Sequence, residues 1–306
     1  MITRFFSTSK PIHLVLVSVF IFWLFITVRF EYYSDGITIL EVFRELSLYS
    51  ILMLSIVVFS FFVSKNNLTK KNNFKLLIFT LFLACIPETV MHGKMIISNV
   101  FILFALRRVL SLRSNLKIKK KLFDAAFWIT LASLFYFWSI LFFILIIAAL
   151  LFHGIHQLKN LIIPFTGSLT VFLIIISYSV MAPSSDAINW FQIDTVSFDF
   201  SNYLLSQVVS ITVLTTLGIY SMVFYVRKIG DKSSDFRSSF LLILISLFIG
   251  VGLVVIAPVK NTSELLFLFA PLSIIITNHI EAFSNKWLAD FYLSVLAVTP
   301  FIQLML

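Results

Sequence analysis

A basic segment followed by an unusually long apolar run constrains this chain more than any other feature. Residues 117–121 contain four lysines, and the 31 residues of 122–152 carry a single charged side chain, Asp124. A helix needs about 20 residues to cross a bilayer core about 30 Å thick. The run is too long for one comfortable crossing and short for two. The way it folds therefore decides on which side of a membrane every later segment lies.

The composition explains why a membrane is the expected solvent. Apolar residues make up 60% of the 306-residue chain and charged residues 12%, whereas soluble proteins contain about 45–50% apolar residues. Too few polar residues remain to cover a soluble surface. We therefore predict an all-α, polytopic transmembrane helix bundle formed by residues 1–306 as one integral membrane domain. The net charge of +9 is typical of cytoplasmic loops, and we expect membrane lipids rather than nucleic acid as partners.

Apolar runs of helical length recur along the whole chain without linkers between them. They cover residues 12–28, 46–63, 74–86, 95–106, 122–152, 161–181, 203–226, 240–256, 265–280 and 287–301. The first follows a basic N-terminal segment, and no small-residue cleavage site comes after it. We therefore expect it to be a retained span rather than a signal peptide.

The positive-inside rule favours one folding of the long run over the other. If residues 122–152 form a hairpin of two short helices, the chain has about eleven spans, a cytoplasmic N-terminus and an outside C-terminus. The inside segments then hold 19 of the 23 basic residues. If the run is a single tilted helix, only 14 basic residues lie inside and 9 lie outside. We therefore predict a hairpin, with a bend near residues 136–139.

The first outside segment contains candidate catalytic acids. Glu31 and Asp35 precede residues 38–46, in which apolar side chains recur at helical spacing and charged side chains share the other face. This pattern predicts a helix that lies on the outer surface before it turns into the second span. The functional interpretation is an outward site with Asp35 or Glu31 as general base. The alternative is an ordinary solvated interfacial loop.

A second outside segment gathers polar groups near the membrane surface. Pro87 ends or kinks the short third span, and Glu88, His92 and Lys94 follow within a few residues. Together with Arg44 from the first outside segment, these side chains could contact a lipid phosphate or another substrate. The alternative is a tight turn between two spans.

Cofactor and metal motifs are missing from the sequence. It contains no phosphate-binding glycine loop, no H-E-x-x-H motif and no cysteine pair, so we expect neither a cofactor nor a metal. The single Cys85 excludes an intrachain disulfide. No acid or base lies deep within the later spans, which argues against a proton-coupled transporter.

Several segments resemble a known family. Ile86-Pro87 and residues 99–108, 122–137 and 161–167 are similar to an uncharacterised family of polytopic inner-membrane proteins from flavobacteria and their relatives. The resemblance covers most of the chain. It implies a multi-pass protein of the bacterial cytoplasmic (inner) membrane and assigns no activity.

A wider resemblance concerns the predicted hairpin. Residues 131–136, Leu-Ala-Ser-Leu-Phe-Tyr, follow a basic inner loop, and this arrangement is similar to polyprenyl-phosphate-dependent glycosyltransferases of the GT-C type. The resemblance implies an outward active site with an acid in the first outer loop, where Asp35 or Glu31 would stand. It also implies a polyprenyl-phosphate-linked glycan as partner. The present chain differs in its short first outer loop and in having no soluble outer domain.

Three functions remain open at this point. The first is a GT-C-like protein that handles a lipid-linked glycan at the outer face. The second is a non-catalytic membrane subunit or scaffold of an envelope complex, with a membrane protein as partner. The third is a transporter or flippase, which requires a polar cavity at the middle of the membrane. Whether the protein is an enzyme is undecided by the sequence.

Overall fold

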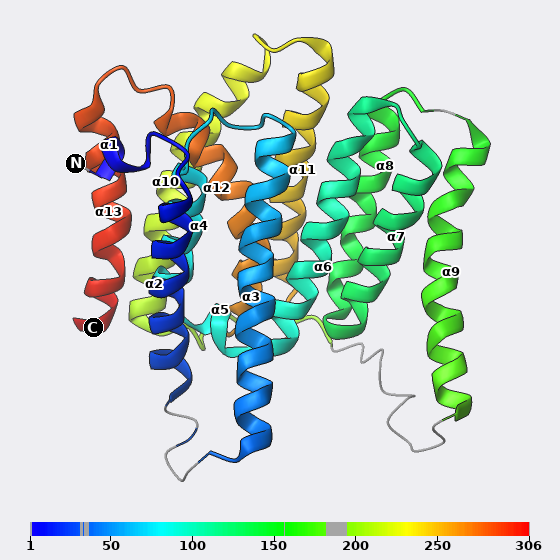
Figure 1. The fold of residues 1–306 in the computed structure, drawn as a ribbon, viewed down its shortest axis with the longest axis horizontal. Helices are drawn as coiled ribbons and strands as arrows, with labels where there is room; N and C mark the ends of the chain where they lie inside the picture. Colours follow the sequence, from blue (N-terminus) through cyan, green and yellow to red (C-terminus); the bar gives the residue numbers. More distant parts are fainter. Residues whose placement is uncertain (1, 31–32, 34–36, 156, 182–194, 306) are drawn as a thin grey trace.

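A computed structural model describes residues 2–30, 33, 37–155, 157–181 and 195–305. Every regular element in these ranges is a helix (Figure 1). In chain order the helices are α1 (Ile2–Phe6), α2 (Pro11–Phe30), α3 (Ile39–Lys65), α4 (Phe74–Cys85), α5 (Glu88–Met91), α6 (Gly93–Leu110), η2 (Ser111–Ser114), α7 (Ile118–Phe135), η3 (Phe137–Phe142), α8 (Phe143–Phe152), α9 (Leu158–Met181), α10 (Leu205–Ile229), α11 (Ser234–Ile256), η5 (Ser263–Leu265), α12 (Leu266–Ile280) and α13 (Lys286–Met305).

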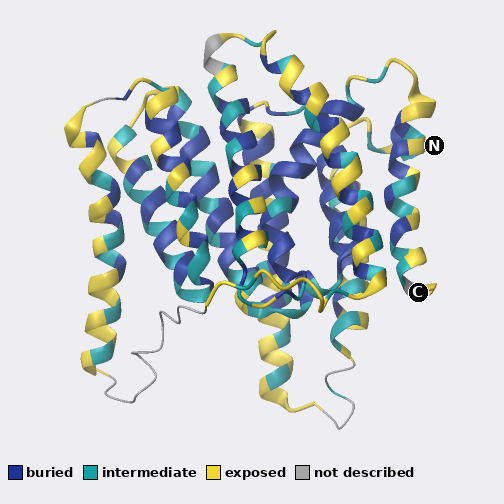
Figure 2. Cartoon of the chain, turned by 180° about the vertical axis from the view of Figure 1, so that it is seen from behind, coloured by how far each residue is buried: buried dark blue, intermediate teal, exposed yellow. Residues whose placement is uncertain are grey.

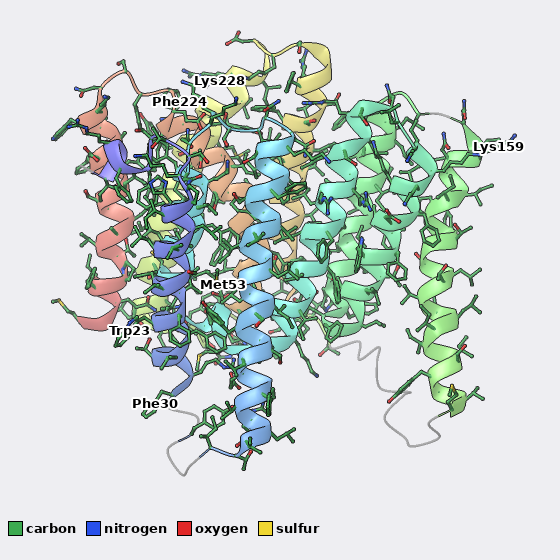
Figure 3. The ribbon with its side chains drawn as sticks, in the orientation of Figure 1. Trp23, Phe30, Met53, Lys159, Phe224 and Lys228 are labelled. Carbon is green, nitrogen blue, oxygen red and sulfur yellow. The ribbon has the colours of Figure 1, made fainter. Side chains whose placement is uncertain are left out.

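The long helices run up and down through one bundle, with the two chain ends at opposite ends of it (Figure 1). Among the described residues, seven helices are long and apolar enough to cross a membrane, and two shorter apolar stretches, Phe74–Cys85 and Phe137–Phe152, accompany them. The protein is therefore a helical membrane bundle, as predicted. Lys159 and Lys228 lie at the same end as the N-terminus, whereas Trp23 and Phe30 extend outward from the lower part of α2 (Figure 3).

The predicted hairpin is confirmed. Helix α7 ends at Phe135, where Tyr136 adopts an extended conformation with φ −144° and ψ 104°. The 3₁₀-helix η3 follows, and α8 then runs back along α7. The break coincides with the expected bend near residues 136–139. Helix α7 begins earlier than the apolar run, because Lys117, with φ 51°, starts the helix inside the lysine segment.

The predicted surface helix at residues 38–46 is wrong. These residues form the first turns of α3, which continues without interruption from Ile39 to Lys65. Thr38 and Glu41 form a capping box, in which Thr38 N–H donates to Glu41 Oε2 over 2.8 Å and Glu41 N–H donates to Thr38 Oγ1 over 3.4 Å. A capping box satisfies the free amides at a helix start. The amphipathic pattern therefore belongs to the exposed beginning of a long span.

Burial is distributed unevenly over the bundle (Figure 2). Helices α4, α6 and α12 are largely buried, whereas α9 is exposed along most of its length. Its packing partner is α7. At Gly167 a Cβ would lie 2.6 Å from Phe123 O, so glycine permits this close approach. Thr130 Oγ1 donates to Ser168 Oγ over 3.0 Å at the same interface.

Candidate functional site

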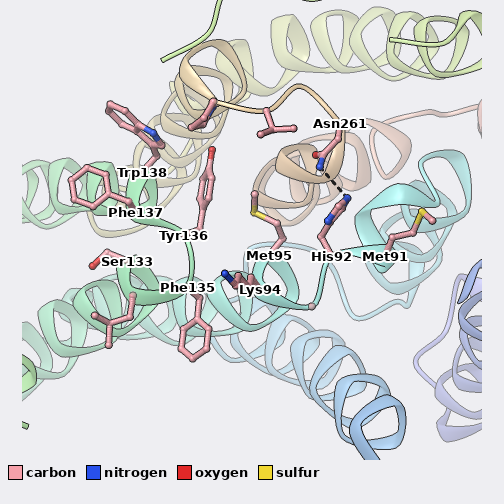
Figure 4. Close-up of a pocket in the computed structure, with 14 residues that line it drawn as sticks. Met91, His92, Lys94, Met95, Ser133, Phe135, Tyr136, Phe137, Trp138 and Asn261 are labelled. Carbon is pink, nitrogen blue, oxygen red and sulfur yellow. Dashed lines mark hydrogen bonds between the residues drawn. The ribbon is translucent and has the colours of Figure 1, made fainter. Parts of the chain in front are cut away.

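The candidate site is a cavity at the end of the bundle opposite the N-terminus, where α6 begins and α7 ends. Its volume is about 500 Å³. Its lining comes from three separate segments (Figure 4) and includes His92, Lys94, Phe135, Tyr136, Trp138 and Asn261. None of the described lining residues is Asp or Glu.

A proline and a glycine shape the wall that carries His92 and Lys94. Pro87 stands where α4 has ended, and the single turn α5 follows it. His92 is extended, with φ −93° and ψ 96°, and α6 starts at Gly93. A Cβ at Gly93 would lie 2.9 Å from Leu48 Cδ2, so glycine lets the start of α6 approach α3. The chain thus turns twice within a few residues and leaves His92 and Lys94 beside the cavity.

Arg29, at the end of α2, holds this turn in place. Its Nη1 donates to Met91 O over 2.6 Å and to Val90 O over 3.1 Å. Its Nη2 donates to Glu45 Oε1 over 2.8 Å, and its Nε donates to the other carboxylate oxygen. Carbonyls at a helix C-terminus lack partners within the helix, and a guanidinium satisfies them well. Sequence reasoning treated Arg29 only as an outside charge and missed this role.

His92 bridges to the loop that follows α11. The Asn261 Nδ2 and His92 Nε2 atoms are 3.0 Å apart, and with this amide orientation the Asn261 N–H donates to the ring nitrogen. Burial, and secondarily the charge of Arg29, lower the pKa of His92 below its ordinary value. The imidazole is therefore neutral at neutral pH and can accept this bond.

Lys94 brings a positive charge to the rim, and aromatic side chains form the opposite wall. Lys94 is exposed, and no described carboxylate lies within ion-pair distance of it. The Tyr136 ring stacks on Phe267 with a centroid distance of 5.6 Å. Trp138 Nε1 is buried and has no hydrogen-bond acceptor among the described residues. The cavity thus offers a cation and aromatic side chains.

The remaining predicted site residues are separate from the cavity. Glu88 faces α10, where it accepts a hydrogen bond of 2.6 Å from Gln207 Nε2. Arg44 is exposed on α3 and donates to Tyr33 Oη over 2.8 Å. Of the four residues expected to contact a substrate, His92 and Lys94 line the cavity, whereas Glu88 and Arg44 do not. Glu88 is separate because α5 turns it toward α10.

The two predicted catalytic acids, Asp35 and Glu31, lie outside the described residues. A third carboxylate that sequence reasoning passed over, Glu264, is buried next to the candidate site and accepts a hydrogen bond of 2.8 Å from Tyr203 Oη. Burial and the charge of Glu264 raise the pKa of Tyr203, so the phenol remains a donor. This pair joins the segment before α10 to η5.

Lys260 differs in role from Lys94, although both lie near the same end of the bundle. Lys260 Nζ donates to Val254 O over 2.6 Å and to Val255 O over 2.7 Å, and it lies 4.6 Å from the centre of the Phe200 ring. It therefore satisfies carbonyls in the last turn of α11, where a cation also complements the helix dipole. Lys94 is the charged side chain left to face the cavity.

Comparison with known proteins identifies the family and no activity. A family model described as a family of unknown function matches residues 1–303. No curated protein and no solved structure gives a significant match. The resemblance to GT-C glycosyltransferases therefore stays a prediction, as does the flavobacterial inner membrane, whereas membership of an uncharacterised family is confirmed. The match covers nearly the whole chain, and the protein belongs to the family of unknown function DUF6427.

Proposed function

We propose that this protein binds a lipid-linked glycan at the outer face of the bacterial inner membrane, in the cavity beside His92 and Lys94. One observation carries the proposal: a single cavity combines a lysine that no described carboxylate neutralises with an aromatic wall. In this proposal eleven helices cross the membrane, the N-terminus lies in the cytoplasm and the C-terminus lies outside.

The distribution of charge supports this orientation. With eleven spans, 19 of the 23 basic residues belong to the N-terminal side of the bundle, which the positive-inside rule assigns to the cytoplasm. Lys159 and Lys228 illustrate this distribution in Figure 3. The cavity lies at the opposite end and would therefore open toward the outside, where polyprenyl-phosphate carriers present their glycans.

The lining chemistry suits a phosphorylated sugar. A lysine ammonium attracts phosphate as a compact charge, and its charge-assisted hydrogen bonds are about twice as strong as neutral ones. Aromatic rings such as Tyr136 and Trp138 offer flat apolar faces to the C–H side of a sugar ring. Pockets of this kind, with few polar groups among aromatic ones, are typical of ligand sites.

Catalysis is a separate part of the proposal. In glycosyl transfer a base accepts the proton of the acceptor hydroxyl, the new glycosidic bond forms, and the polyprenyl phosphate leaves. No described lining residue is a carboxylate, and we assign the base to Asp35 or Glu31, as the resemblance to GT-C enzymes implies. The same observation favours a second candidate function, a non-catalytic subunit that binds the glycan for a partner membrane protein.

The transporter alternative receives less support. A cavity of about 290 Å³ lies between α10, α11 and the first half of α12. Its lining is aliphatic and aromatic except for Thr215 and Gly218. Such a lining offers a polar solute almost no hydrogen-bond partners at the depth where they are needed.

A binding measurement tests the proposal. The full chain in lipid nanodiscs is titrated with undecaprenyl phosphate carrying one hexose, and bound ligand is measured by native mass spectrometry. We expect Lys94→Gln to weaken binding about tenfold, because it removes a charge-assisted contact, and Trp138→Phe to weaken it less. Lys286→Gln, an exposed lysine at the other end of the bundle, is the matched control. Equal affinity of Lys94→Gln and wild type would overturn the proposal.

A second measurement separates catalysis from binding. Asp35→Asn and Glu31→Gln variants are expressed in the native host, and surface glycans are profiled alongside protein level. A changed profile at normal protein level supports transfer. An unchanged profile together with wild-type ligand binding would reject the enzyme and leave the non-catalytic subunit.

A further inference from the structure

A second cavity lies at the opposite, N-terminal end of the same α6–α7 pair, with a different lining. Its volume is about 360 Å³. Six basic side chains line it, and none of the described lining residues is acidic. The six are Lys65, Arg107, Arg108, Arg113, Lys117 and Lys121. They come from the end of α3, the end of α6, η2 and the start of α7, and we call this the cationic cavity.

Hydrogen bonds hold several of these cations in fixed positions. Lys121 Nζ donates to Ser114 Oγ over 2.7 Å and also to Ser111 O. Arg113 Nη1 donates to Asn66 O over 3.3 Å, and its guanidinium lies 4.1 Å from the centre of the Phe236 ring. The cations therefore belong to an ordered wall, and a ligand would not have to order them on binding.

The positive charge of the cavity is largely uncompensated. Arg108 pairs with Asp124 over 2.8 Å, but no described carboxylate lies within ion-pair distance of the other five cations. Like charges held close together raise the free energy of the protein unless an anion neutralises them. The geometry thus favours an anionic ligand with several acceptor oxygens.

An apolar track leads away from the cationic cavity along α3. Leu54, Val57 and Phe61 are exposed and recur at helical spacing, and Lys65 continues the same face. The Phe61 ring lies 4.8 Å from the Arg107 guanidinium and 5.5 Å from Lys65 Nζ. A ligand whose anionic end occupies the cavity could therefore lay an acyl chain on this track.

We propose that the cationic cavity binds the phosphate group of an anionic membrane lipid, with an acyl chain on the α3 track. Arg107, Lys65, Lys117 and Lys121 would supply donors to the phosphate oxygens. The site is distinct from the outward cavity, and its ligand does not depend on the glycan proposed there. A free phosphate would satisfy the same cations but would leave the apolar track unused.

Thermal unfolding of the full chain in a neutral detergent tests this proposal. The probes are phosphatidylglycerol, phosphatidylcholine and inorganic phosphate, and retained lipid is counted by native mass spectrometry. The test variant is Arg107→Gln/Lys121→Gln. The control is Lys119→Gln/Lys120→Gln, which removes the same charge from exposed lysines that do not line the cavity. Lys65→Gln/Lys117→Gln is a second test variant, which changes only exposed side chains and keeps the structural hydrogen bonds of Lys121.

We expect phosphatidylglycerol to stabilise the wild type and the control, and both test variants to bind it about tenfold more weakly. Equal losses in the control and the test variants would indicate diffuse surface charge and overturn the site. Stabilisation by inorganic phosphate alone would keep the phosphate chemistry but overturn the lipid as its source. No stabilisation by any probe would overturn the proposal altogether.

Discussion

Helices α12 and α9 have opposite environments, although both are strongly apolar. Within the most apolar stretch of each segment, 89% of the residues are buried for Ser263–Ile280 and 17% for Leu158–Met181, although both segments are apolar enough to cross a membrane. In water both apolar helices would have to be buried. In a bilayer the lipid tails are as apolar as a protein core, so polar and small residues mark helix contacts instead.

The largest expected difference between the two helices is the loss of stability when a phenylalanine on each is truncated. Phe269 on α12 is buried and packs against Phe82 with a centroid distance of 5.4 Å, whereas Phe165 on α9 is exposed. We expect Phe269→Ala to lower the free energy of unfolding by about 3–5 kcal/mol. Phe165→Ala should change it by less than about 0.5 kcal/mol. Equilibrium unfolding in mixed micelles measures both, and equal losses would break the comparison.

A smaller effect is expected where α9 touches the bundle. A Cβ at Gly167 would meet Phe123 O at 2.6 Å, and a backbone oxygen cannot rotate away. Gly167→Ala should therefore cost about 2 kcal/mol through displacement of α9 from α7. Gly252→Ala on α11 is the matched control, because nothing lies within 4 Å of its Cβ position. If neither alanine lowers the free energy of unfolding in the same assay, α9 does not approach α7 as closely as the 2.6 Å distance indicates.

The next largest loss of stability is expected when a side-chain hydrogen bond of α12 is removed. Asn278 Nδ2 donates to Leu68 O and to Ile274 O, each over 2.9 Å. Asn278→Ala leaves the buried Leu68 carbonyl without this donor, and we expect a loss of about 1.5 kcal/mol. Thr277→Val, which removes a bond only within α12, should cost less. A larger loss in Thr277→Val would show that the link to Leu68 contributes little.

The smallest effect is expected for the polar bond of α9. Thr130 Oγ1 and Ser168 Oγ are 3.0 Å apart, and interhelical bonds in membrane proteins contribute about 0.6 kcal/mol on average. A double-mutant cycle with Ser168→Ala and Thr130→Val measures the coupling. A coupling as large as the loss in Asn278→Ala would indicate that α9 is attached as firmly as α12.

The sequence predicted the arrangement of helices better than their contacts. The hairpin at residues 122–152 followed from its length and from the charges around it, and the bend at Tyr136 was expected because aromatic and polar residues interrupt the run there. The surface helix at residues 38–46 was wrong because the same amphipathic pattern occurs where a long span emerges from the bundle. Thr38 and Glu41 carried the capping signal for a helix that begins at Ile39, but this signal is the same for a surface helix and for a continuous span.

The candidate site was predicted only in part. His92 and Lys94 were recognised because polar side chains follow Pro87 at a membrane edge. Their cavity also needs Trp138 and Asn261, which lie far away in sequence and meet them only through the turns at η3 and after α11. Glu88 and Arg44 instead form hydrogen bonds with Gln207 and Tyr33. The spacing of residues in the sequence does not show that these partners lie close to them.

The sequence by itself determined that this chain is a helical membrane protein, because only lipid can solvate so much apolar surface, and it predicted which segments share a side, because charges resist crossing a bilayer. Only the tertiary structure decided that α12 is central and α9 peripheral, and that six dispersed cations form one cavity. Lipid tails and protein interior are equally apolar, so hydrophobicity cannot distinguish them. Which helix is central and which is peripheral depends on the fit between helix surfaces. The close approach at Gly167 and the hydrogen bonds of Asn278 are examples of contacts that favour one packing.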